Sequence, residues 1–158
     1  NPVFDANVFR VGVTDETNKN STGNSHVFFA FRSIPGVCKI GSYVGNSDPS
    51  SPPNGPFIAT GFKPRWVIYR VIESGLDAYS WTVVDTARSP INGPHSMVLH
   101  PNMDSADSSG SGNVIDILST GFKRRDNHDS VNDLGKKYIY MAMAEIGGNG
   151  TLPPIYGR

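Results

Sequence analysis

Carboxylates are the side chains of this sequence that could carry out acid–base chemistry. Cleavage of a glycosidic bond needs two of them facing one groove, and the candidates are Asp77, Asp85, Asp116 and Glu145. These four residues form no recognisable catalytic motif. We therefore expect no catalytic residue and no enzyme activity, with a fragment of a depolymerase as the alternative.

Two of these carboxylates have a structural interpretation. Asp85 and Arg88 are three residues apart at a predicted strand end, and this spacing predicts a structural ion pair. Asp116 alternates with the apolar residues Ile115 and Ile117. We expect its side chain to accept a hydrogen bond from a neighbouring strand or turn.

The sequence also contains no clear motif for a nucleophilic catalytic site or for a metal site. The sequence contains no Gly-x-Ser-x-Gly elbow, and its four histidines lie in different segments. Asp104 and Asp107 lie among Ser and Gly, but an EF-hand loop needs alternating oxygen ligands and a closing Glu. His95 and His100 are five residues apart, which places them on opposite faces of a strand. We expect no metal ion and no cofactor.

Aromatic side chains at strand ends or in loops could stack against sugar rings. The candidates for such a glycan site are Tyr43, Tyr79, Trp81 and Tyr156. Trp66 is predicted to lie in the core instead, because Val67, Ile68 and Tyr69 follow it directly.

The composition indicates which elements must position these residues. Gln is absent, Glu occurs three times and Leu five times, whereas Gly, Ser, Asn and Pro make up 59 of the 158 residues. Helices favour Ala, Leu, Glu and Gln, and turns favour Gly, Ser, Asn and Pro. The composition therefore predicts an all-β fold with negligible helix.

Short runs rich in β-branched and aromatic residues recur between turn clusters, and each predicts a strand. The runs cover residues 8–14, 26–32, 38–44, 57–62, 65–72, 80–85, 97–99, 113–118 and 137–145. About nine such strands predict an antiparallel β-sandwich, with a closed barrel as the alternative.

The segments between these strands are polar. Residues 14–24 and 126–134 are predicted to be loops, and residues 103–112 an exposed, mobile loop. Lys123, Arg124 and Arg125, followed by Asp126, are interpreted as a solvated turn of mixed charge. A salt bridge between subunits is the alternative role for this turn.

The balance of charge and the shortness of the apolar runs each exclude one class of partner. Fourteen basic residues balance fourteen acidic ones, so little drives the release of counterions on which nucleic-acid binding depends. No apolar run is long enough to span a bilayer, and we expect no membrane insertion. The single cysteine, Cys38, excludes an intrachain disulfide and is predicted to be a small buried hydrophobe.

The chain contains an internal repeat. Residues 23–34 resemble residues 135–146, with Gly aligned to Gly, Ala30 to Ala142 and Ile34 to Ile146. We infer a β-sandwich module at residues 36–146 and an extended tail at 147–158. Residues 1–35 are then the closing hairpin of a preceding repeat unit or N-terminal strands of the sandwich. Because the chain begins with Asn1, we expect a processed chain or a piece of a longer one.

Several segments together resemble a known family. They are residues 41–46, residues 54–68 with Gly55-Pro56-Phe57 and Trp66, residues 113–122, and residues 138–145 with the set from Trp81 to Arg88. This pattern is similar to a repeated domain of bacteriophage tail-fibre and virion-surface proteins, common in marine phages. The Pro-rich loop at residues 48–53 departs from it.

The resemblance implies a β-sandwich of the jelly-roll or lectin-like kind. It also implies a structural protein of the virion, either a tail-fibre or a capsid-decoration module, that acts in assembly and host-surface exposure. It implies assembly in the bacterial cytoplasm and a location on the virion surface. The expected partners are other virion proteins and copies of the chain itself, arranged as a trimer. A carbohydrate-binding module that recognises host glycans is the alternative.

Overall fold

A computed structural model describes residues 27–50, 53–72, 79–88, 97–109 and 115–145 of the chain. The chain divides into two compact units, Asn1–Phe31 and Arg32–Arg158. In the first unit the described residues are 27–31, which form neither strand nor helix. All the elements below belong to the second unit. The strand predicted at residues 8–14 lies outside the described residues.

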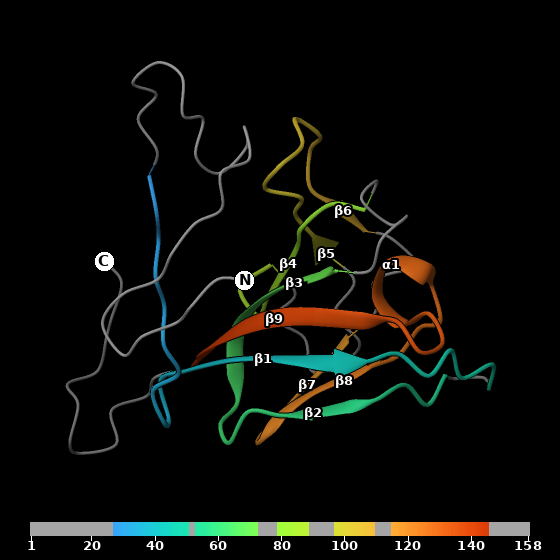
Figure 1. Cartoon of the computed structure of the whole chain (residues 1–158), viewed down its shortest axis with the longest axis horizontal. Coiled ribbons are helices and arrows are strands. Elements are labelled where there is room, and N and C mark those ends of the chain that lie inside the picture. Colours follow the sequence, from blue (N-terminus) through green and yellow to red (C-terminus); the bar gives the residue numbers. More distant parts are fainter. Residues whose placement is uncertain (1–26, 51–52, 73–78, 89–96, 110–114, 146–158) are drawn as a thin grey trace, which may run out of the picture. The chain divides into compact units, whose positions relative to one another are not determined.

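The larger sheet has four antiparallel strands (Figure 1), in the order β1-β9-β3-β4. They are β1 (Cys38–Val44), β9 (Lys137–Ala144), β3 (Pro64–Val71) and β4 (Thr82–Asp85). The register places Tyr43 opposite Tyr138 and Tyr69 opposite Tyr140. The last strand of the module thus lies at the centre of the sheet, and β1 lies at its edge.

The second sheet has three antiparallel strands, in the order β2-β8-β7. They are β2 (Phe57–Ala59), β8 (Gly121–Arg124) and β7 (Ile115–Leu118), and they run below β1 and β9 in the view of Figure 1. A short ribbon pairs β5 (Met97–Val98) with β6 (Ser108–Ser109). One helical turn, α1 (Asp129–Asn132), lies where β1 ends and β9 begins.

The core lies between the two sheets. The larger sheet contributes Tyr43, Val67, Tyr69, Tyr138 and Tyr140, and the smaller sheet contributes Ile58, Ile115, Ile117 and Phe122. The Phe122 ring meets Tyr140 edge-on, with ring centroids 5.4 Å apart. Such packing of two apolar sheet faces confirms the predicted antiparallel β-sandwich; the jelly-roll connectivity stays a prediction.

The strand prediction holds best where apolar residues dominate. Each strand predicted between residues 38 and 145 has a counterpart: the strand at residues 38–44 has the predicted ends, and the others are shifted or shortened at one or both ends. The prediction lacks β8, because the charged residues at the end of this strand are typical of a turn. Two loop predictions are wrong in part, since residues 126–134 contain α1 and residues 103–112 contain β6.

The strand predicted at residues 26–32 is wrong for residues 27–32, which form no strand. Backbone pairing stops at the bridge between Ile34 and Cys38. The next outward-facing group on β1, the Ile40 N–H, donates to the side-chain Oγ of Ser33 at 3.0 Å. A side chain thus takes the hydrogen bond that a longer hairpin would give to backbone.

The prediction that Trp66 belongs to the core is also wrong. Side chains alternate along a strand, and in β3 the buried set is Val67, Tyr69 and Val71, so Trp66 faces the other side and is half-buried. Cys38 is likewise half-buried rather than buried.

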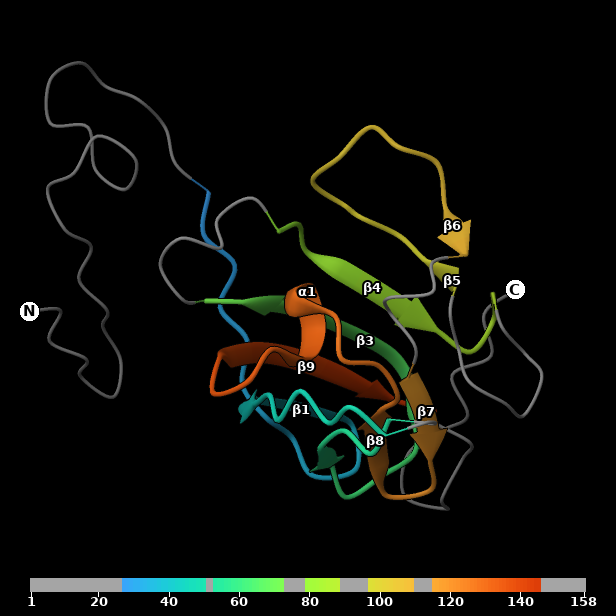
Figure 2. The same cartoon turned by 90° about the vertical axis from the view of Figure 1, so that its right-hand side faces the viewer.

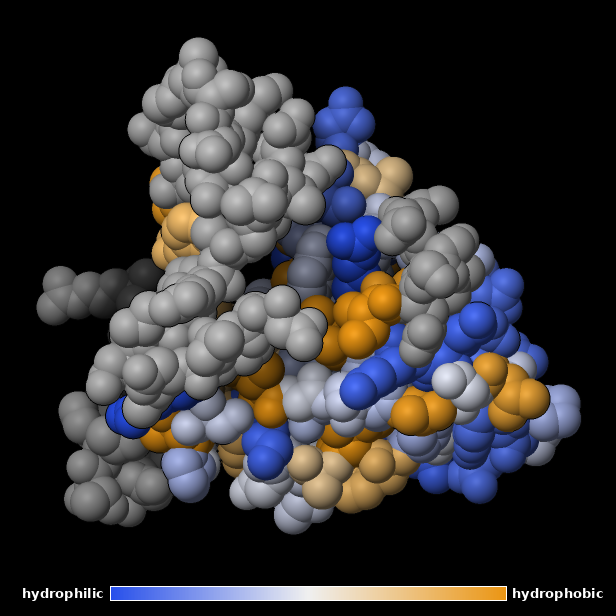
Figure 3. All heavy atoms as spheres, viewed as in Figure 1, coloured by the Kyte–Doolittle hydropathy of each residue, from blue (hydrophilic) through white to orange (hydrophobic). Residues whose placement is uncertain are grey.

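Apolar residues lie between hydrophilic ones on the face of the molecule seen in Figure 3. Among the described residues, no helix has the length and apolarity to cross a membrane.

Candidate functional site

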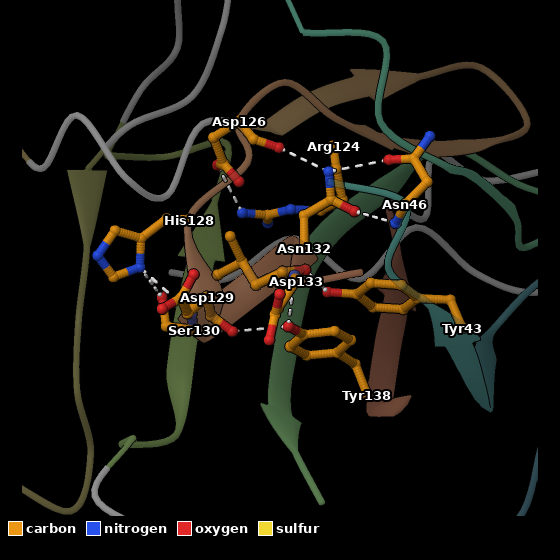
Figure 4. A network of polar contacts seen from close by, with 11 residues as sticks. Tyr43, Asn46, Arg124, Asp126, His128, Asp129, Ser130, Asn132, Asp133 and Tyr138 are labelled. Atoms are coloured by element: carbon orange, nitrogen blue, oxygen red, sulfur yellow. Dashed lines mark hydrogen bonds and ion pairs between the residues drawn. The ribbon is translucent and has the colours of Figure 1, made fainter. Parts of the chain in front are cut away.

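The chemically richest part of the described structure is a network of polar groups around α1 (Figure 4). His128 is the N-cap of α1, and its Nδ1 accepts a hydrogen bond from Ser130 N at 3.2 Å. The C-cap of the helix is Asp133, which has extended backbone. Asn132, the last residue of this single turn, is fully buried.

Arg124, the last residue of β8, is the centre of the network. Its side chain is fully buried, and Nη2 donates to Asp126 Oδ2 at 2.8 Å. The guanidinium lies over the ring of Tyr69, 4.8 Å from its centroid, a favourable position for a cation on an aromatic face. The interpretation of residues 123–125 as a solvated turn is therefore wrong for Arg124.

Burial alone would make the charged guanidinium unstable, because a charge loses its hydration in the core. It acts to lower the pKa of Arg124, but Tyr69, Tyr43 and Asp126 more than offset it and raise that pKa above the ordinary value. Burial likewise raises the pKa values of Tyr43 and Tyr69. The buried network therefore holds a charged arginine beside neutral tyrosines.

Asn132 joins three loops through its amide group. Its Nδ2 donates to Asp126 O at 2.7 Å and to Asn46 Oδ1 at 3.1 Å, and its Oδ1 accepts from Asn46 N at 2.9 Å. The segment after β1, the segment after β8 and α1 are thereby tied together. Residues separated by more than eighty positions in the sequence meet at one amide.

Two stacked tyrosines close the network from the sheet side. Tyr43 and Tyr138 lie with their ring centroids 4.9 Å apart and nearly parallel. Tyr43 Oη donates to Val131 O at 2.8 Å, and Tyr138 Oη donates to Asp129 O at 2.6 Å while it accepts from Asp133 N. Burial raises the pKa of Tyr138 to about 12.

Tyr43 was predicted to contact a glycan, and the structure contradicts this. The side chain is 7% exposed and belongs to the core. The cause is its position in β1, where it shares the inner face of the sheet with Tyr138. Its hydroxyl is used to hold the backbone of α1.

Two glycines allow the backbone to approach this network closely. A Cβ on Gly45 would lie 2.2 Å from Asp133 O, and a Cβ on Gly55 would lie 2.7 Å from Cβ of Arg124. No real side chain fits at such distances. Both glycines belong to the segments at residues 41–46 and 54–68 that carry the family resemblance.

Tyr79 and Trp81 lie together on the segment that leads into β4, and both are half-buried. The Tyr79 ring meets the ring of His128 edge-on at 6.3 Å. Trp81 N donates to Asn102 Oδ1 at 3.0 Å, and Trp81 O lies 3.1 Å from His100 Nδ1. These two predicted glycan contacts are adjacent to α1 and to the loop after β5, whereas Tyr156 lies outside the described residues.

The predicted ion pair between Asp85 and Arg88 is confirmed. Arg88 Nε lies 3.0 Å from Asp85 Oδ2, and Arg88 Nη1 also reaches Asp107 at 3.2 Å. Asp85 Oδ1 accepts from the backbone N–H groups of Ala87 and Arg88, both at 2.9 Å. This pair therefore fixes the turn after β4.

The other carboxylates considered for catalysis have structural partners as well. Asp116 accepts from Arg125 Nε, which confirms its predicted hydrogen bond to a neighbouring segment. Glu145 pairs with Lys63 at 2.6 Å. Asp77 lies outside the described residues. Within the described ranges, no group of three His, Cys, Asp or Glu side chains could hold a metal ion.

Sequence reasoning missed Arg124, Asp126 and Asn132 as a set. One signal was available, because Arg124 is two residues from Phe122 and residues at this spacing share a face of a strand. Once Phe122 is placed in the core, Arg124 must follow it inward. Asn132 carries no such signal, since its burial depends on a single helical turn.

Comparison with known proteins gives one result. Residues 3–146 match the family described as "Domain of unknown function (DUF7483)", and the chain belongs to that family. No curated protein and no solved structure matches the chain. The family match crosses residue 35, where a boundary between units was expected, and ends at residue 146, where the module was expected to end.

Proposed function

We propose that this chain is a structural module of a phage virion, from a tail fibre or a capsid decoration, that acts in assembly and is exposed at the host surface. One observation carries the proposal: the buried network of Arg124, Asp126 and Asn132 that fastens three loops to the end of the sandwich. Its charged and polar groups are used to hold the chain's own loops. An exterior module of a particle needs such order without disulfides.

The network also supports the proposal through the residues that resemble the phage domain. At Gly45 and Gly55, which lie in the resembling segments, an added Cβ would overlap Asp133 and Arg124. Two of the resembling segments thus contain glycines that a larger residue could not replace without a clash. The same reasoning gives no role to a metal, a cofactor or a catalytic residue.

Quantitative mass spectrometry of purified particles tests the proposal. We expect peptides of this chain in density-purified virions of the phage that encodes it, at a fixed number of copies per particle. Hundreds of copies would indicate a capsid decoration, and a few dozen or fewer a fibre. Peptides confined to the soluble lysate, with none in particles, would contradict the proposal.

Glycan binding is the second candidate. The edge-on contact of the Tyr79 ring with His128 favours it, as does the half-buried Trp81 two residues further along the chain. Half-buried aromatic rings beside imidazole and amide groups offer both a stacking face and hydrogen-bonding partners for a sugar. A glycan array would test this, with Tyr79→Ala and Trp81→Ala expected to abolish binding. Phe57→Ala, which removes an exposed aromatic residue from β2, is the matched control. Equal binding by all four proteins would exclude this site.

A further inference from the structure

Strand β1 has one side on which no described strand pairs with it. In the described sheet it has one neighbour, β9, and the ladder bonds of an antiparallel pair alternate between the two sides of a strand. The carbonyl of Val37 and both backbone groups of Gly45 face the side of β9. Val37 O accepts from Ala144 N, Gly45 N donates to Lys136 O, and Gly45 O accepts from Gly135 N. By this alternation Cys38, Ile40, Ser42 and Val44 face outward.

The chain itself covers half of this edge. Ile34 and Cys38 exchange two backbone hydrogen bonds of 2.9 and 3.0 Å, and Ser33 Oγ both accepts from Ile40 N and donates to Ile40 O. The Cys38 thiol also donates to Arg32 O at 3.0 Å. This cap ends at Ile40. Ser42 and Val44 lie beyond it, and both are exposed.

A segment suited to such an edge lies nearby in the sequence. Residues 27–31 read Val-Phe-Phe-Ala-Phe, a run with high strand propensity and without charge, Gly or Pro. Val27, Phe29 and Phe31 are 78%, 79% and 65% exposed. An exposed apolar run of this kind marks an interaction site in a soluble protein.

The internal repeat gives the segment a specific match. At the offset of 112 residues, residues 27–31 align with residues 139–143, which lie in β9, the neighbour of β1. In β9, Met141 stands opposite Ile40 and Ala142 opposite Lys39. The side-chain pattern that β1 accommodates on its covered side is therefore repeated in the exposed segment.

We propose that residues 27–31 of one copy add as a strand to the open edge of β1 in a second copy, beside Ser42 and Val44. The second copy is favoured over the same chain because Ser33 takes the Ile40 backbone groups that a continued hairpin would use. Edge addition supplies backbone hydrogen bonds and buries the apolar side chains. This inference rests on the proposed assembly role and names its partner, a second copy of this chain.

Light scattering coupled to size-exclusion chromatography tests the proposal on the 158-residue chain. We expect a mass above the monomer that rises with concentration. Ser42→Pro removes an outward N–H, which an edge strand tolerates, and should weaken association at least tenfold without changing the melting temperature. Phe29→Ser should weaken it similarly, whereas Leu134→Ser, an exposed apolar control, should not. A monomer at every concentration, or association unaffected by both test variants, would overturn the proposal.

Disulfide trapping distinguishes exchange between copies from pairing within one chain. In a Cys38→Ser background, Ala30→Cys protein is mixed with differently tagged Ser42→Cys protein. A mixed disulfide that forms faster than with Ser119→Cys protein is expected, whereas a double variant that closes only within one chain would refute exchange. A chain found in virions but monomeric contradicts strand exchange alone, and an exchanging chain absent from virions contradicts the virion role alone.

Discussion

Two arginine–aspartate pairs of this domain have nearly the same sequence spacing and opposite environments. Arg124 and Asp126, two residues apart, have side chains 0% and 6% exposed. Arg88 and Asp85, three residues apart, have side chains 26% and 13% exposed. The sequence spacing predicts the pair of Asp85 and Arg88 correctly, but it gives no sign that Arg124 and Asp126 are buried. Burial of the side chains therefore decides how much a charged pair contributes to stability.

The physical difference is desolvation. A partly hydrated ion pair gains little Coulomb energy and loses little hydration, so it typically contributes about 0–1 kcal/mol to the free energy of unfolding. A buried pair has lost its water and depends on its partners, so removal of one partner typically costs about 3–5 kcal/mol. The Tyr69 ring and the Asn132 amide belong to the surroundings that make Arg124 tolerable in the core.

Asp126→Ala should therefore have the largest effect on stability. It leaves the guanidinium of Arg124 buried without its carboxylate, and we expect a loss of about 3–5 kcal/mol in the free energy of unfolding. Urea denaturation measures this loss, with Asp126→Asn as a milder variant if Asp126→Ala does not fold. The double variant Arg124→Met/Asp126→Ala should recover part of the loss. A loss no larger than that of Asp85→Ala would show that burial does not separate the two pairs.

Gly45→Ala should destabilise the buried polar network by a steric clash with backbone atoms. The new Cβ would lie 2.2 Å from Asp133 O, so the loop after α1 must shift. We expect a cost of about 3 kcal/mol, at the upper end for overpacking. Gly36→Ala is the control, because its Cβ meets nothing within 4 Å and only its positive φ of 73° opposes it, at about 1 kcal/mol. Equal losses would show that the close approach at Gly45 relaxes freely.

High pH should weaken the buried region selectively. Burial holds the pKa of Tyr43 well above its ordinary value and that of Tyr138 at about 12, while phenols of the unfolded chain ionise near pH 10. Their stabilisation is therefore complete below about pH 10 and is lost as the pH rises toward 12. We expect the melting temperature to fall over this window. The fall should be shallower in Tyr43→Phe and Tyr138→Phe, and identical slopes would contradict this assignment.

Asp85→Ala should have the smallest effect of the four. It removes the partly exposed ion pair and the acceptor for two backbone N–H groups, and we expect a loss of about 1 kcal/mol. Chemical denaturation beside the wild type measures it. Lys63→Ala, which breaks the more exposed pair with Glu145, is the control with a loss near zero. A loss of about 3 kcal/mol at Asp85 would remove the contrast between the regions.

The candidate site shows where prediction from sequence reached its limit. Asp85 and Arg88 were found because their contact is local, and a turn of a few residues decides it. The environments predicted for Tyr43 and Trp66 are wrong, although both residues lie in correctly predicted strands. The environment predicted for Arg124 is also wrong, and here the strand itself, β8, was not predicted. The environment of these three residues depends on which face of a strand meets the core, and a shift of one residue exchanges the two faces.

The sequence by itself determined the β class, the approximate positions of most strands and the local ion pair after β4. Those features follow from backbone propensity and short spacing, which act within a few residues. The tertiary structure alone decided that Arg124, Asp126 and Asn132 meet Asn46 and Tyr43 under a single helical turn. This contact depends on strand pairing between residues more than eighty positions apart. The cost of burying the charge arises only once that pairing has excluded water from Arg124.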